Sequence, residues 1–130
     1  MMLGVLVTPP PVCEEGRLTY AESLYGEKMK LPERTNETAG LYANACVELA
    51  EEMGTRSINL WYLMQETEGW QKKFLSDGLH LTPEGKAVVY HEVLRVLNEL
   101  RLSAAEMPYD SLFTWKLMEK ILRALQKHCL

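Results

Sequence analysis

The sequence predicts an α/β fold in which helices cover both faces of a parallel sheet. Residues 3–8 form a continuous apolar run, which is typical of a strand buried on both faces. A helical pattern over residues 35–53 follows, and residues 56–63 then have the composition of a second strand. A strand, a helix and a strand in this order predict the right-handed crossover that joins parallel strands.

The first strand is expected to cover residues 3–8 and to end at the proline run of residues 9–11, because proline cannot donate to a sheet ladder. A strand that starts so close to the first residue, without a lead-in, suggests that preceding material is missing. Residues 14–34 are polar and contain two glycines and a proline, which predicts a long excursion with a short helix over residues 20–30.

The next segment has the clearest helical signal. Thr35 or Asn36 is a suitable N-cap, and Gly54 should end the helix. Between these positions apolar residues recur at helical spacing: Tyr42, Cys46, Leu49 and Met53. After a short loop, residues 56–63 predict the second strand.

The second half of the chain predicts helices. Residues 66–75 indicate a loop with a helical turn, after which Thr82 can cap a helix that starts at Pro83 and runs to about residue 102. A break at Met107 and Pro108 precedes a last amphipathic helix with an apolar face made of Leu112, Trp115, Met118, Leu122, Leu125 and Cys129. We therefore expect a domain portion over residues 1–103 and a helical extension over residues 104–130.

Asp77 and His80 are the strongest chemical signal in the sequence. A turn at Gly78 can bring the Asp77 carboxylate to one ring nitrogen of His80, which leaves the other nitrogen free to act as a general base. Their loop follows the second strand, and reactive groups collect at the carboxyl ends of strands in open parallel sheets. The same pattern also fits a hydrogen bond that only braces a turn.

Residues 74–85 (FLSDGLHLTPEG) resemble the final conserved block of the SGNH hydrolases, also called GDSL esterases/lipases. The match is closest to their isoamyl-acetate-hydrolysing esterase branch, and residues 6–12 (LVTPPPV) resemble the strand and loop after the third block of that branch. The resemblance covers about residues 3–102, the C-terminal half of the family domain. It implies a three-layer α/β/α, flavodoxin-like fold, truncated to that half and followed by an extra helix.

The resemblance also implies an activity, the hydrolysis of short acyl esters by a Ser-His-Asp triad. His80 would be the general base and then the acid, and Asp77 its orienting partner. The family nucleophile lies in an N-terminal Gly-Asp-Ser motif, and no serine of this sequence has that context: Ser23, Ser57, Ser76, Ser103 and Ser111. The oxyanion-hole glycine and the asparagine of a Gly-x-Asn-Asp motif are absent too, and one oxyanion donor is worth roughly 100- to 1000-fold in rate. We therefore expect little esterase activity from this chain alone.

Other candidate residues have simpler interpretations. Cys13, at the end of the first strand, is an alternative nucleophile, although a cysteine without a role is the common case. Ser76 is expected to make a local turn bond, and His91 and His128 to be solvated or favoured by a helix dipole. Three aromatic residues are expected to pack rather than to bind a ligand: Trp61, Trp70 and Trp115.

Composition limits the classes of partner and cofactor that the chain is expected to bind. The formal net charge of -4 gives no basic field, so nucleic acid and anionic membranes are poor candidates. The three cysteines are widely spaced without a C-x-x-C pair, so we expect no disulfide framework, metal or cofactor. No apolar run approaches the roughly 18 residues of a membrane span, and the start lacks a signal-peptide pattern. We expect a reducing, cytoplasmic environment.

A non-catalytic interaction protein is the alternative from a different class. An unpaired edge on the strand at residues 3–8 would favour a homo-oligomer joined through the sheet. The apolar stripe of the last helix can also bind a partner, although a helix more often packs on its own domain.

Overall fold

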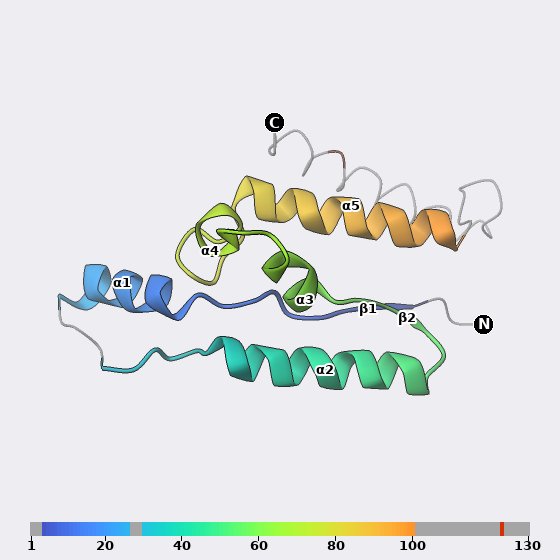
Figure 1. The fold of residues 1–130 in the computed structure, drawn as a ribbon, viewed down its shortest axis with the longest axis horizontal. Helices are drawn as coiled ribbons and strands as arrows, with labels where there is room; N and C mark the ends of the chain where they lie inside the picture. Colours follow the sequence, from blue (N-terminus) through green and yellow to red (C-terminus); the bar gives the residue numbers. More distant parts are fainter. Residues whose placement is uncertain (1–3, 27–29, 101–122, 124–130) are drawn as a thin grey trace. The chain divides into compact units, whose positions relative to one another are not determined.

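The computed structural model describes residues 4–26, 30–100 and 123, and divides into two compact units, Met1–Gly85 and Lys86–Leu130. In the first unit, β1 (Val5–Val7) and β2 (Arg56–Ile58) lie side by side as a parallel pair (Figure 1). Val5 is opposite Arg56 and Val7 is opposite Ile58. The predicted parallel strand pair is confirmed, with both strands shorter than expected.

The expectation that the first strand is buried on both faces is wrong for the described residues. Val5 and Leu6 are half-buried, and Val7 is 45% exposed. Within the described part of the chain β1 pairs with β2 alone, in a two-stranded sheet. The apolar side chains of β1 are therefore less buried than those of a strand in the interior of a parallel sheet.

Helix α1 (Glu14–Tyr25) begins six residues before the predicted short helix at residue 20, because Cys13 caps it. The Cys13 Sγ atom accepts a hydrogen bond of 3.4 Å from the Gly16 N–H. Two glutamates, Glu14 and Glu15, stand in the first turn, where the helix dipole favours negative charge. Gly26, in the left-handed conformation at φ 69°, ends the helix.

Helix α2 (Asn36–Glu52) confirms the predicted helix, with Thr35 as its N-cap. The helix runs along the strand pair and contacts both strands (Figure 1). Its buried side consists of small residues: Ala39, Gly40, Ala43 and Ala50. The larger apolar residues of the predicted pattern lie exposed: Tyr42, Leu49 and Met53. A Cβ atom added at Gly40 would lie 2.8 Å from the Trp61 ring, so glycine permits this close packing.

The predicted second strand is too long, because Asn59 ends it. The Asn59 side chain accepts a hydrogen bond of 3.1 Å from the Tyr62 N–H and so caps α3 (Leu60–Gln65). Leu60 and Met64, one helical turn apart, are the buried residues of α3. The apolar residues 60–63 would suit either a strand or a helix, and the N-cap formed by Asn59 selects the helix.

The remaining elements agree with the sequence as far as they are described. The helical turn expected in residues 66–75 is α4 (Trp70–Lys73), and α5 (Pro83–Glu99) begins at the predicted proline. Thr82 caps α5 through its Oγ1 atom, which accepts from the Gly85 N–H at 3.1 Å. The predicted last helix, with Trp115 and His128, and the 103/104 boundary lie outside the described residues apart from Arg123. Among the helices that the structure describes, none is long and apolar enough to cross a membrane.

Candidate active site

Asp77 and His80 lie in a loop that hydrogen bonds close at its base. The Thr82 N–H donates to the Phe74 carbonyl oxygen at 2.9 Å, and the Ser76 N–H donates to the His80 carbonyl oxygen at 2.8 Å. The hydroxyl of Thr82 also donates to the Lys73 carbonyl oxygen at 2.6 Å. The residue that caps α5 therefore also fixes the loop.

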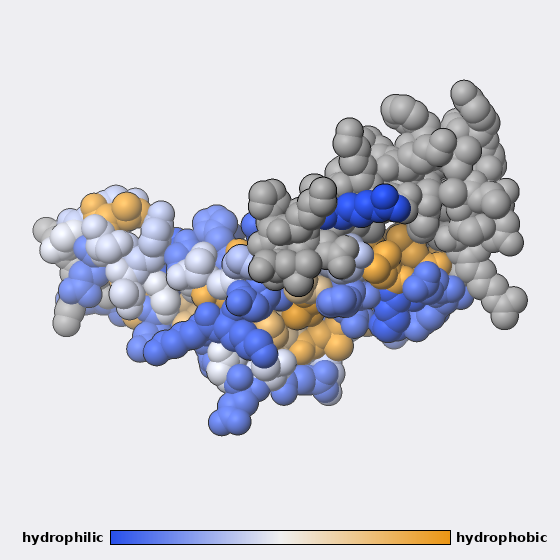
Figure 2. Space-filling view, turned by 90° about the horizontal axis from the view of Figure 1, so that it is seen from above, coloured by the Kyte–Doolittle hydropathy of each residue, from blue (hydrophilic) through white to orange (hydrophobic). Residues whose placement is uncertain are grey.

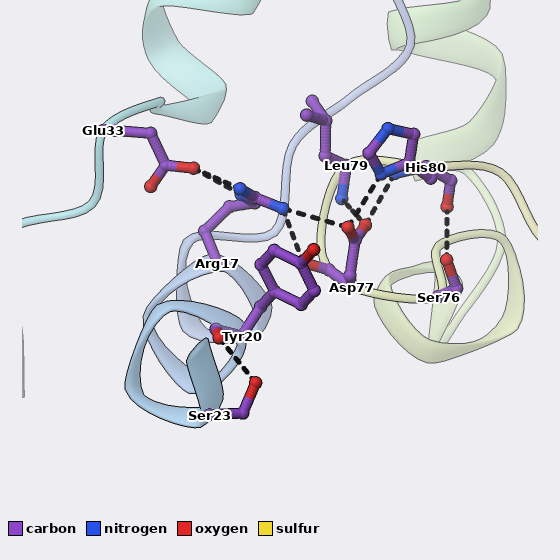
Figure 3. A network of polar contacts seen from close by, with 8 residues as sticks. All are labelled: Arg17, Tyr20, Ser23, Glu33, Ser76, Asp77, Leu79 and His80. Carbon is purple, nitrogen blue, oxygen red and sulfur yellow. Dashed lines mark hydrogen bonds and ion pairs between the residues drawn. The ribbon is translucent and has the colours of Figure 1, made fainter. Parts of the chain in front are cut away.

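The predicted contact between Asp77 and His80 is present. The His80 Nδ1 atom lies 2.7 Å from the Asp77 Oδ2 atom (Figure 3). The other carboxylate oxygen, Oδ1, accepts from the N–H groups of Leu79 at 3.0 Å and His80 at 2.8 Å. The His80 side chain is 73% exposed, whereas that of Asp77 is 14% exposed. No described residue is bonded to Nε2, so this nitrogen can meet a substrate or a nucleophile.

The environment keeps Asp77 ionised. Burial raises the pKa of this carboxyl group, but the hydrogen bonds from the His80 backbone, the His80 ring and the Leu79 backbone outweigh it and lower the pKa to about 2. At neutral pH the carboxylate therefore accepts hydrogen bonds only. A charged acceptor at Nδ1 holds the imidazole with its proton on that nitrogen and leaves Nε2 as the basic atom.

Arg17 of α1 is a member of this site that the sequence interpretation missed. Its Nη1 atom lies 3.0 Å from Asp77 Oδ2, and the residue is only 9% exposed. On its other side Arg17 pairs with Glu33, which accepts from Nε at 2.6 Å (Figure 3). The contact joins residues far apart in sequence, and residues 14–34 have the polar composition of an irregular excursion, so no local pattern indicates it.

The start of α1 also contacts the backbone of the loop. The Cys13 N–H donates to the Gly78 carbonyl oxygen at 2.9 Å. A Cβ atom added at Gly16 would lie 2.8 Å from the Gly78 Cα atom, and one added at Gly78 would lie 2.7 Å from the Arg17 nitrogen. Glycine at both positions lets the two backbones meet.

An open pocket of about 1040 Å³ adjoins the Asp77 loop on the side of α1. Its lining includes residues from α1, α4 and the loop, among them Cys13, Tyr20, Trp70, Leu75 and Asp77. It is large enough for a small organic molecule and presents both apolar and polar groups.

The other candidate residues serve local structure. Cys13 lines the same pocket as Asp77, but its Sγ atom caps α1. Ser76 makes the expected turn bond, donating from Oγ to the His80 carbonyl oxygen at 3.2 Å. Trp61 packs on α2 and donates its Nε1–H to Asn36 Oδ1 at 2.9 Å. His91 is exposed on α5. Within the described residues no cluster of His, Cys, Asp and Glu is suited to a metal ion.

Comparison with known proteins relates both the loop with Asp77 and His80 and the strands and helices before it to one family. The model of the GDSL-like lipase/acylhydrolase family matches residues 2–93. A GDSL esterase/lipase of Arabidopsis thaliana is 67% identical over 110 residues, which are 84% of this chain and 46% of the relative. The GDSL esterase/lipase WDL1 of Oryza sativa subsp. japonica is 35% identical over 114 residues, 88% of this chain and 40% of that protein.

An isoamyl acetate-hydrolyzing esterase 1 homolog of Bos taurus is 40% identical over 86 residues, 66% of this chain and 33% of the relative. The chain therefore spans less than half the length of these curated relatives. The family model nevertheless covers most of the chain and includes both motifs that carried the resemblance. This protein belongs to the GDSL-like lipase/acylhydrolase family.

Proposed function

We propose that Asp77 and His80 are the acid/base half of a carboxylic ester hydrolase centre that acts on short acyl esters. The observation that carries this proposal is the 2.7 Å contact between His80 Nδ1 and Asp77 Oδ2, combined with a ring that is 73% exposed. A buried acceptor on one nitrogen and access to the other are what general base catalysis by histidine requires.

In the proposed mechanism the Nε2 atom of His80 takes the proton of a serine hydroxyl as that hydroxyl attacks the ester carbonyl. The same nitrogen then returns the proton to the departing alcohol, and the acyl-enzyme is hydrolysed by water in the same way. Asp77 keeps the imidazole in the required tautomer and stabilises the imidazolium that forms. The names of the isoamyl acetate-hydrolyzing esterase homologs support a short acyl group as the substrate class.

The nucleophile and the oxyanion donors are proposed to come from outside these 130 residues. The sequence contains no Gly-Asp-Ser motif, and the chain matches less than half of each of these relatives. In this proposal the chain is the C-terminal half of a three-layer α/β/α domain, and β1 and β2 are two strands of its sheet.

Hydrolysis of a short-chain aryl acetate by the purified 130-residue chain tests the missing nucleophile. We expect a rate no higher than that of a His80→Ala variant, because a base without its serine is inert. Robust, His80-dependent turnover would contradict this expectation, and Cys13→Ala and Ser76→Ala would then show which of these residues attacks the ester.

A second candidate function is a homo-oligomer formed through the sheet edge. The observation that favours it is that β1 pairs only with β2 among the described residues, and that Val7 on β1 is 45% exposed. Figure 2 shows hydrophobic surface in separate places on a mainly hydrophilic face of the described residues, one of them at the end where α1 lies. Sedimentation of the chain at several concentrations tests this candidate: a compact monomer at all of them would count against it.

A further inference from the structure

We propose that Arg17 is a positioning residue of the hydrolase centre: its guanidinium fixes the Asp77 carboxylate and, through it, the imidazole of His80. The inference rests on the proposed function of Asp77 and His80. It assigns a role to a residue of α1, a segment in which the sequence indicated no functional residue.

The two carboxylate oxygens of Asp77 are held from different directions. Oδ1 accepts from the backbone N–H groups of Leu79 and His80, which belong to the same loop. Oδ2 is the oxygen in contact with the His80 ring, and Arg17 Nη1 binds it at 3.0 Å. Arg17 is the described residue that restrains Oδ2 from outside the loop. Fixing both oxygens prevents rotation of the carboxylate, so Oδ2 stays aimed at Nδ1.

Arg17 is itself held in place. Glu33 accepts from its Nε atom at 2.6 Å and also pairs with Nη2, and the guanidinium carbon lies 4.8 Å from the centre of the Tyr20 ring. The Nη1 atom further approaches the Asp77 carbonyl oxygen at 3.4 Å. A planar group with several donors can bind two carboxylates and a carbonyl group at once, whereas a lysine presents a single point charge.

The burial of both side chains indicates that the contact between Arg17 and Asp77 is a fixed part of the site. The Arg17 side chain is 11% exposed and that of Asp77 is 14% exposed, so both charges have lost most of their water. Charged groups in such surroundings keep fixed partners, because an unpaired one would be unstable. Figure 3 shows the resulting order of contacts, from Glu33 through Arg17 and Asp77 to His80.

The state of the His80 ring in the full 130-residue chain tests the proposal. Nitrogen NMR of the neutral imidazole separates the tautomer protonated on Nδ1 from the one protonated on Nε2. In the wild-type chain we expect the Nδ1–H form to dominate. In Arg17→Met, which keeps the bulk but removes the charge and the donors, we expect the ratio of the two tautomers to fall by roughly tenfold, equivalent to about 1.4 kcal/mol.

Arg95→Met is the matched control. Arg95 is also ion-paired, but to Glu92 and Glu99 of its own helix α5, and its side chain is 49% exposed. It should leave the ring nitrogen signals of His80 unchanged. A wild-type tautomer ratio in folded Arg17→Met would overturn the proposal.

If Arg17→Met does not fold, as judged by circular dichroism, Glu33→Gln replaces it. This variant keeps Arg17 and weakens only its outer anchor, so a smaller shift of the tautomer ratio in the same direction is expected, and an unchanged ratio would overturn the proposal. The proposed function fails by a different result, which is ester hydrolysis that survives His80→Ala in an active chimera, where a relative supplies the nucleophile. The two failures are therefore distinguishable.

Discussion

The backbone N–H of Cys13 donates a hydrogen bond of 2.9 Å to the carbonyl oxygen of Gly78, which joins the start of α1 to the loop that holds Asp77 and His80. Gly78 adopts φ 82° at this contact. The conformation of the loop is thus set partly by its own turn and partly by a segment that lies far earlier in the chain.

Gly78→Ala is expected to destabilise the protein by roughly 3 kcal/mol, from left-handed strain and from overlap with the backbone of α1. The added Cβ atom would lie 2.7 Å from the Arg17 nitrogen and also too near the Cys13 carbonyl oxygen. Gly69→Ala is the control, since Gly69 has φ 72° but open space around it. It should lose only about 1 kcal/mol. Urea unfolding measures both, and equal losses would show that the contact with α1 does not matter.

Asp77 should make the stability of the chain depend on acid pH. Its pKa is lowered from 3.8 to about 2 in the folded state, so its contribution is complete above about pH 4 and is lost as the pH falls towards 2. The loss over that range amounts to about 2 kcal/mol.

Urea unfolding of the wild-type chain and of Asp77→Asn between pH 5 and pH 2 measures this contribution. The stability difference between them should shrink as the pH falls, because the asparagine does not titrate. Glu68→Gln, at an exposed position outside the loop, is the control for the removal of a carboxylate. A constant difference between wild type and Asp77→Asn would contradict the lowered pKa.

Asn36→Ala is expected to cost about 2 kcal/mol, because it leaves the Val12 N–H without its acceptor and removes one of the two acceptors of the Trp61 ring N–H, whose other acceptor is the Asn36 carbonyl oxygen at 3.1 Å. The Asn36 Oδ1 atom accepts from the Val12 N–H at 3.0 Å and from the Trp61 ring N–H at 2.9 Å. Asn44→Ala, at an exposed position of the same helix, should be neutral or slightly stabilising. Thermal unfolding of the two variants checks the difference, and similar melting temperatures would contradict the assigned role of Asn36.

Local chemistry made much of the fold predictable. Thr35 and Thr82 are strong N-caps followed by helical patterns, and both helices begin where these residues place them. The contact between Asp77 and His80 was predictable because both residues lie in one short loop with a turn glycine between them. The parallel pairing of the two strands followed from the helix that joins them.

The features that the sequence did not predict depend on single capping atoms or on contacts between distant residues. Cysteine is not a common N-cap, so the early start of α1 was missed, and Asn59 was not recognised as the residue that turns an apolar segment from strand to helix. The role of Arg17 could not be predicted, because its partners Glu33 and Asp77 meet it only in the folded chain.

The most direct test of the central claim is the effect of His80→Ala in an active chimera. The matched 110 residues of the Arabidopsis thaliana relative, 67% identical to this chain, would be replaced by the corresponding residues of this protein. We expect the chimera to hydrolyse a short-chain aryl acetate, and His80→Ala to lower kcat by roughly 10⁴-fold or more. A folded chimera without activity, or one whose activity survives His80→Ala, would contradict the assignment of Asp77 and His80 as the acid/base half of an ester hydrolase.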